Sequence, residues 1–187
     1  YATTFSGFYL AVMLVLFGLI VRAVSLEFGA HDPKWGRAWD ACFTIGSFLP
    51  ALVLGVALGN VIAGVPLAAN GDYAGVPLLG LLSPFTLVVG ALGFAMCMAA
   101  GAAWVALKTE RTSAVHGRAE KQRRVWHVVA LALFVVATVL AFAVVKPQFA
   151  PGMLVAGAIF AIAFVVCIAA SIVQAEKGND LAAFVLQ

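Results

Sequence analysis

Five long apolar runs restrict the fold of this chain more than any other feature. They cover residues 5–26, 42–63, 81–107, 125–145 and 153–173. Each is close to the length of about 20 residues that an α-helix needs to cross the hydrocarbon core of a bilayer. Backbone groups in lipid must be satisfied internally, so a spanning segment is either a helix or a strand of a closed barrel. The polar–apolar alternation of barrel strands is absent, so we predict five transmembrane helices.

The composition supports the same fold class. The chain is 64% hydrophobic and 10% charged, and its mean hydropathy is +1.09. A soluble domain is about half apolar and about a quarter charged. A water-soluble core of this size cannot hide such an excess of apolar residues. We therefore predict an all-α integral membrane protein, a polytopic bundle in which residues 1–187 form a single transmembrane domain.

Both ends of the sequence resemble interior segments of a longer protein. The chain begins at Tyr1, with no methionine and no basic stretch before the first apolar run. Residues 181–187, LAAFVLQ, resemble the opening of another helix. We expect a fragment that holds five spans and the start of a sixth.

The basic residues are distributed unevenly over the loops. Ten of the eleven Lys and Arg residues lie in or beside the first, third and fifth loops, around residues 27–40, 108–124 and 174–180. The second loop has none, and the fourth has only Lys146. The positive-inside rule therefore places the first, third and fifth loops in the cytoplasm. We interpret the basic third loop as a topology signal with some attraction to lipid headgroups, and a nucleic-acid patch is the alternative.

Small residues mark the faces on which the helices are expected to pack. Apolar burial cannot drive helix association in lipid, so close packing at small side chains contributes much of it. The second run carries Gly55 and Gly59, and the third carries Gly93 and Gly101, each pair at helical spacing. Pro50 removes a backbone hydrogen bond and is expected to bend the second helix. The alternative interpretation of these residues is a substrate-binding broken helix of the transporter kind.

Few polar residues lie near the membrane, and ionisable ones there are functional candidates because they are costly. Arg22 and Glu27, at the end of the first run, either reach the interface by snorkelling or face a proton or water path. Asp40 either caps the second helix or belongs to the same path. Asn60 is expected to hydrogen-bond to a neighbouring helix, or to line a cavity. His127 is expected at the interface, with a heme ligand as the remote alternative.

Sequence signals for soluble enzymes and metal sites are absent. The three cysteines lie in or beside apolar runs without a CxxC partner, so we interpret them as small buried hydrophobes. There is no phosphate loop, GxGxxG with a following acid, GxSxG or HExxH. We predict no catalytic and no metal-binding residue. The tryptophans are interpreted as an aromatic belt at the cytoplasmic interface: Trp35, Trp39, Trp104 and Trp126.

Four short motifs in the first half of the chain are more specific. They are Phe5–Tyr9 (FSGFY), Arg22 with Glu27, Trp39–Asp40, and Gly59–Asn60 followed by Gly64–Pro66. In this order and spacing they resemble subunit II of cytochrome bd-type quinol oxidases. The resemblance is strong to about Leu107 and rests on hydropathy beyond it. It covers roughly the third to seventh of the family's nine spans and the start of the eighth. Ala23 departs from the family, which usually has proline after the arginine.

The resemblance implies a function that the residues alone do not. In this family, subunit I holds the hemes and the quinol site, and the complex oxidises quinol and reduces dioxygen to water with cytoplasmic protons. Subunit II packs against it in the bacterial inner membrane. The resemblance therefore implies a non-heme-ligating subunit, with hemes and quinol in the partner and membrane lipid around both.

The same resemblance assigns expected roles to the polar residues. Arg22, Glu27 and Asp40 are candidates for the cytoplasmic mouth of a proton path, or for bracing the loop that shapes it. The alternatives are a secondary transporter fragment, with a site at Pro50 and Asn60 and the glycines between them, and a purely structural membrane anchor.

Overall fold

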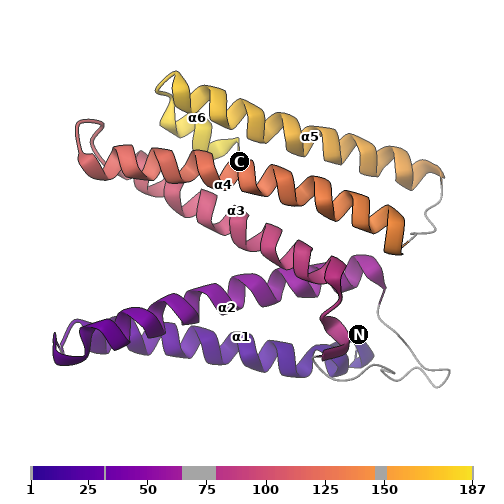
Figure 1. Ribbon diagram of the computed structural model, residues 1–187, viewed down its shortest axis with the longest axis horizontal. Helices are drawn as coiled ribbons and strands as arrows, with labels where there is room; N and C mark the ends of the chain where they lie inside the picture. The colour runs from indigo at the N-terminus through magenta and orange to yellow at the C-terminus, as the bar shows by residue number, and fades with distance from the viewer. Residues whose placement is uncertain (1, 32, 65–78, 146–150, 187) are drawn as a thin grey trace. The chain divides into compact units, whose positions relative to one another are not determined.

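A computed structural model describes residues 2–31, 33–64, 79–145 and 151–186, and within these ranges it contains only helices and turns (Figure 1). The α-helices are α1 (Ala2–Gly29), α2 (Gly36–Ala63), α3 (Pro84–Lys108), α4 (Ala114–Leu140), α5 (Pro151–Glu176) and α6 (Asp180–Val185). Short 3-10 turns lie at Pro33–Trp35 and Leu79–Leu81, and a π-helical turn at Ala141–Val145 follows α4. The predicted all-α class is confirmed.

Five of these helices are long and apolar enough to cross a membrane, by length and composition. The candidate spans are Gly7–Gly29, Gly36–Ala63, Pro84–Lys108, Ala114–Ala143 and Gly157–Glu176. The predicted polytopic bundle of five spans is therefore confirmed. The six-residue helix α6 lies where the sequence predicts the start of a sixth.

Two helices, α2 and α4, begin six or more residues before their apolar runs. Helix α2 begins at Gly36 and α4 at Ala114, so the connections before them are shorter than the predicted loops at 27–40 and 108–124. The prediction that residues 114–124 form a loop is wrong. Lys, Arg, Gln and Glu are good helix formers, so hydropathy marks only the part of a helix that is in lipid. Ser113 supplies the start signal, because its hydroxyl accepts the Val115 N–H at 3.2 Å.

The chain divides into two compact units, residues 1–94 and 95–187, with the boundary inside α3. In the first unit, α1 and α2 form an antiparallel hairpin, and the start of α3 completes it (Figure 1). In the second unit, α4 and α5 lie side by side after the end of α3, and α6 folds back against α5 (Figure 1). The prediction of a single transmembrane domain stays a prediction.

Most of the apolar surface of the helices is not covered by the described chain. In the most apolar window of each span, only 17 to 28% of the residues are buried. Even Cys97 and Cys167 are exposed, so the expectation that all three cysteines are buried is wrong for these two. Lipid, further helices or another subunit must cover this surface, because water cannot solvate it at acceptable cost.

Candidate functional site

The connection between α1 and α2 carries the predicted charged candidates. Arg22 is exposed on α1, and its guanidinium Cζ lies 5.6 Å from the centroid of the Phe43 ring on α2. This cation–π contact fixes the position of the cation relative to α2. Glu27 is exposed in the last two turns of α1, and its carbonyl oxygen lies 2.9 Å from Nδ1 of His31. Asp40 is exposed in the second turn of α2.

The structure does not pair these three charges. Within the described ranges, the ion pairs that form involve none of Arg22, Glu27 and Asp40. Asp40 is also not the cap of α2, because Trp35 occupies the N-cap position without a side-chain cap bond. The capping alternative is therefore wrong, because the helix starts at Gly36, six residues before the apolar run. The two carboxylates and the guanidinium remain separate charged groups on the surface of the hairpin.

An aromatic contact braces this connection. The rings of Phe28 and Trp39 stack with centroids 5.7 Å apart, and a Cβ on Gly29 would lie 3.3 Å from Cβ of Trp39. Trp39 is only half exposed, and its Nε1 is buried without a hydrogen-bond acceptor in the described chain. Trp39 therefore packs on α1 instead of serving only as an interfacial belt residue. The brace holds the ends of α1 and α2 together beside the charged candidates.

Glycines and one proline bring the helices of the first unit into close contact. A Cβ on Gly46 would lie 2.7 Å from the Gly18 carbonyl oxygen, and one on Gly18 would lie 3.1 Å from the Pro50 ring. Pro50 is buried inside α2, so it contributes directly to the α1–α2 contact. These approaches leave no room for larger side chains on either helix.

The predicted packing glycines of α2 face α3. A Cβ on Gly55 would lie 2.8 Å from the Cα of Gly90, and one on Gly59 would lie 3.0 Å from the Cα of Thr86. A Cβ on Gly93 would make an ordinary contact of 3.4 Å with the Cα of Gly55. Gly101, in contrast, has no atom within 4 Å of such a Cβ. Glycines of one sequence stripe therefore have different surroundings.

Asn60 bonds to a neighbouring element. Its Nδ2 donates to the Val56 carbonyl at 2.9 Å and to the Leu81 carbonyl at 2.8 Å. The hydroxyl of Thr86 donates to the same Leu81 carbonyl at 2.7 Å. Asn60 and Thr86 are both buried, so this carbonyl is satisfied by two donors away from solvent. The cluster ties the turn before α3 to the end of α2.

The second unit contains buried charges that sequence reasoning missed. Arg123 is 2% exposed, and its Nη1 lies 3.7 Å from Oδ1 of Asp180, the first residue of α6. Arg111 reaches the other carboxylate oxygen of Asp180 at 3.3 Å. A second, exposed pair joins Arg124 to Glu176 at 2.8 Å. These contacts connect the start of α4 and the loop before it to the turn between α5 and α6.

One signal in the sequence points to this cluster. The buried residues of α4 recur at helical spacing, and three of them are polar side chains among alanines. They are His116, Ala119, Arg123, His127, Ala130 and Ala137. An arginine and two histidines on a small-residue face indicate burial. The acidic partner, Asp180, lies far along the chain and has no local signal.

The buried histidines do not fit a heme. An axial ligand needs an imidazole nitrogen that faces a space wide enough for the macrocycle. Nδ1 of His116 lies 3.0 Å from the Ala106 carbonyl oxygen, and the residue is buried. His127 is completely enclosed by the described chain, and its position at the membrane interface stays a prediction. Within the described ranges, no group of three or more His, Cys, Asp and Glu side chains is placed to hold a metal ion.

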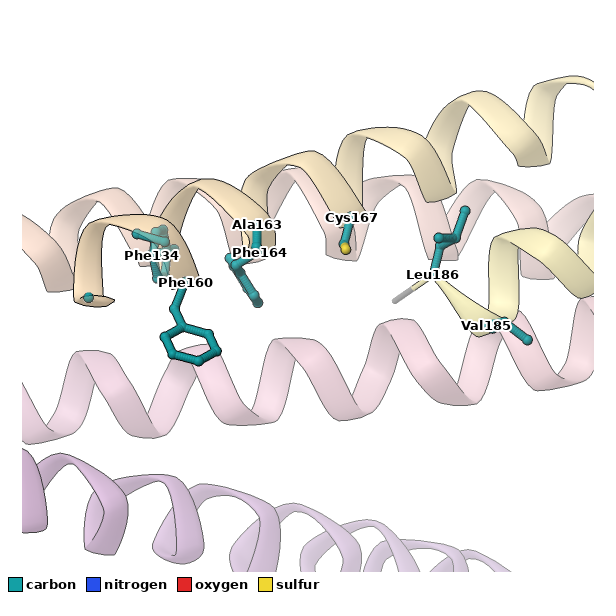
Figure 2. A pocket seen from close by; sticks show the side chains of 9 residues that line it. Phe134, Phe160, Ala163, Phe164, Cys167, Val185 and Leu186 are labelled. Carbon is teal, nitrogen blue, oxygen red and sulfur yellow. The ribbon is translucent and has the colours of Figure 1, made fainter. Parts of the chain in front are cut away.

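Two of the hollows are lined by apolar residues. One, of about 660 Å³, lies in the second unit. Figure 2 shows Phe160, Phe164 and Cys167 of α5 around it, with Val185 and Leu186 at the end of α6. A hollow of about 210 Å³ lies between α1 and α2 beside Leu81 and is equally apolar. These surfaces can pack against apolar groups, but they offer no acid, base or cation.

The fold and site define a multi-pass, all-α membrane protein in which several polar side chains, such as Asn60, Arg123 and Asp180, connect one helix to the next element. Comparison with known proteins defines it further. The model of the family "Cytochrome bd terminal oxidase subunit II" matches residues 1–187. The chain belongs to this family, and it is a multi-pass bacterial membrane protein.

Curated relatives agree with the family model. The chain is 40% identical over 145 residues to a "probable cytochrome oxidase subunit 2" of Haemophilus influenzae and 36% identical over 145 residues to "cytochrome bd-I ubiquinol oxidase subunit 2" of Escherichia coli. Each match covers 74% of this chain and 38% of the relative. A "cytochrome bd ubiquinol oxidase subunit 2" of Bacillus subtilis is 31% identical over 111 residues, covering 58% of this chain and 32% of the relative. The chain thus spans well under half the length of these relatives.

Proposed function

We propose that this chain is part of a non-heme-ligating subunit of a cytochrome bd-type terminal oxidase in the bacterial inner membrane. The complex would couple quinol oxidation to the reduction of dioxygen to water. The observation that carries this proposal is the family match along all of residues 1–187. This chain alone is not expected to be catalytic, and the oxidoreductase activity belongs to the assembled complex.

The partner is a heme-bearing subunit I, which also provides the quinol site. Two features of the chain support this division. The buried histidines do not fit a heme, and large apolar faces on α1 and α5 are uncovered, including Phe17 at 63% and Phe160 at 76% exposure. The hemes of the partner would supply the dioxygen chemistry. This chain would contribute an apolar surface that packs against the partner, and a connection on the cytoplasmic side of the complex.

The role proposed for the α1–α2 connection is in the uptake of protons from the cytoplasm. Water formation consumes protons, and the positive-inside rule favours a cytoplasmic position for this basic connection. Glu27 and Asp40 are exposed carboxylates without an ion-pair partner in the described ranges, so neither is committed to a structural pair. Arg22, whose guanidinium lies over the Phe43 ring, is the cation of the same hairpin. The three residues would form or brace the mouth of a proton path.

The transporter alternative has less support. Broken-helix sites in transporters use unwound backbone to bind substrate near the middle of the membrane. Helix α2 is continuous from Gly36 to Ala63, through Pro50. Gly55 and Gly59 contact α3, and Asn60 binds the Leu81 carbonyl, so these groups are occupied by packing.

The test is deletion of the full-length gene followed by spectroscopy of the membranes. We expect loss of the heme d absorbance band and of the matching quinol-dependent oxygen consumption, with recovery of both when the gene is restored. An unchanged band and unchanged oxygen consumption in the deletion strain would refute the proposal.

A further inference from the structure

A groove of about 340 Å³ lies between the end of α3 and the start of α4, within the second unit. Its walls are mainly apolar, and they carry Arg118 and Gln122 as polar residues. Cys97, Gly101 and Val105 line it on α3, and Trp126 lines it on α4. The groove therefore combines an apolar channel with one cation.

Gly101 keeps the α3 wall of the groove low. It is exposed, and no atom lies within 4 Å of the position that a Cβ would occupy. In contrast to Gly55 and Gly59, its missing side chain does not serve contact with another described helix. The open space beside Gly101 is part of the groove.

The length and charge of α4 place the groove relative to the bilayer. The candidate span Ala114–Ala143 has 30 residues, or about 45 Å at 1.5 Å per residue. This exceeds the hydrocarbon thickness of about 30 Å. Its Lys, Arg and Glu residues all precede Val125, so the first three turns are at the level of the lipid headgroups. Arg118 thus lies at headgroup level, and Trp126 lies about 12 Å deeper along the axis.

The local charges are unbalanced at the mouth of the groove. Arg111, Arg123 and Arg124 are compensated by Asp180 and Glu176. Arg118 is exposed and forms no ion pair in the part of the chain that the structure describes, and the same holds for Lys121 one turn later. An uncompensated guanidinium at headgroup level matches a phosphate group, which it binds through charge-assisted hydrogen bonds.

We propose that this groove binds one anionic phospholipid. The phosphate contacts Arg118, the Gln122 amide donates to a headgroup or ester oxygen, and an acyl chain lies over Gly101 toward Cys97 and Trp126. The inference rests on the membrane fold and not on the proposed oxidase activity. A neutral quinone fits the apolar walls equally well but leaves the charge of Arg118 unmatched.

The test measures lipid retained by the full-length protein. The protein is purified from its native membrane, exchanged into an equal mixture of phosphatidylglycerol and phosphatidylcholine, and examined by native mass spectrometry. We expect one retained phosphatidylglycerol, and about a fivefold lower occupancy in Arg118→Gln, the effect of one basic residue at the membrane surface. Gly101→Leu, which fills the groove without touching the charge, should also reduce occupancy.

Arg124→Gln is the matched control, because Arg124 is equally basic but pairs with Glu176 and does not line the groove. It should retain the lipid. Equal retention of the two lipids, equal loss in the Arg118 and Arg124 variants, or loss of a bound quinone in place of phospholipid from Gly101→Leu would overturn the proposal. Circular dichroism and gel filtration check that both groove variants are folded.

Discussion

At the scale of single residues, the charged groups of the two units differ in their surroundings. Arg22, Glu27 and Asp40 are exposed and form no ion pair within the described ranges. Arg123 is enclosed and depends on Asp180 for its neutralisation. A carboxylate without an ion-pair partner is available for another role, whereas the carboxylate of Asp180 is committed to a buried cation. We therefore expect Arg22, Glu27 and Asp40 to matter for function, and the pair of Arg123 and Asp180 to matter for stability.

Glu27→Gln tests the first expectation. The amide keeps the size of the side chain but cannot carry a proton, so oxygen consumption by the purified complex should fall, by about tenfold if this carboxylate limits proton delivery. The heme absorbance should stay unchanged. Glu110→Gln, an exposed acid on the next basic connection, is the control and should retain full activity. Unchanged turnover in Glu27→Gln would contradict a role in the proton path.

Asp180→Asn tests the second expectation. Removing one partner of a buried ion pair leaves an uncompensated charge, and the loss of stability is typically 3–5 kcal/mol, so we expect about 3 kcal/mol here. Glu176→Gln removes the exposed partner of Arg124 and should cost less than about 1 kcal/mol. Unfolding of the detergent-solubilised protein, followed by circular dichroism, measures both. Equal destabilisation by the two substitutions would show that Arg123 does not depend on Asp180.

At the scale of elements, close contact at glycines sets how the first three helices pack. Gly55→Ala places a Cβ within 2.8 Å of backbone on α3, which cannot move like a side chain. Such overpacking should cost about 1–3 kcal/mol of unfolding free energy. Gly101→Ala is the matched control, because its Cβ meets open space, and it should be neutral or slightly stabilising. The same loss in both variants would mean that helix propensity, and not the α2–α3 contact, determines the effect.

The sequence allowed the five spans to be predicted because about 20 apolar residues in succession have few other solutions. The N-terminal starts of α2 and α4 could not be predicted from hydropathy. The turns around Asp40 and Arg118 are helical although they are charged and not apolar. The sequence also did not show that Gly55 contacts another helix whereas Gly101 faces open space. A periodic stripe identifies a helix face, but the partner of that face is decided by tertiary packing.

The candidate site was less predictable than the fold. Arg22, Glu27 and Asp40 were found by their charge beside apolar runs, and their function stays a prediction. Asn60 was correctly expected to bond to a neighbour, although the acceptor is a turn carbonyl and not a helix. The pairing of Arg123 with Asp180 joins residues far apart in the sequence, and no local pattern encodes it.

At the scale of the whole molecule, the basic connections predict an orientation in the membrane that labelling can test. In a variant with Cys42, Cys97 and Cys167 replaced by serine, Ser113→Cys lies in the connection between α3 and α4, and Asp72→Cys lies in the loop outside the described residues. A membrane-impermeant thiol reagent should label Ser113→Cys only in inverted vesicles and Asp72→Cys only in intact spheroplasts. The reverse pattern would place the proposed proton-side residues on the wrong face.

The uncovered apolar faces of the spans are available for assembly with another subunit, as proposed above. The most direct measurement is purification of the full-length protein, under mild detergent, from its native membrane. We expect that it co-purifies at a constant ratio with a heme-bearing partner, that the sample shows a heme d absorbance band, and that quinol drives its oxygen consumption. Isolation of the chain alone, heme-free and with substrate flux after reconstitution into liposomes, would contradict it.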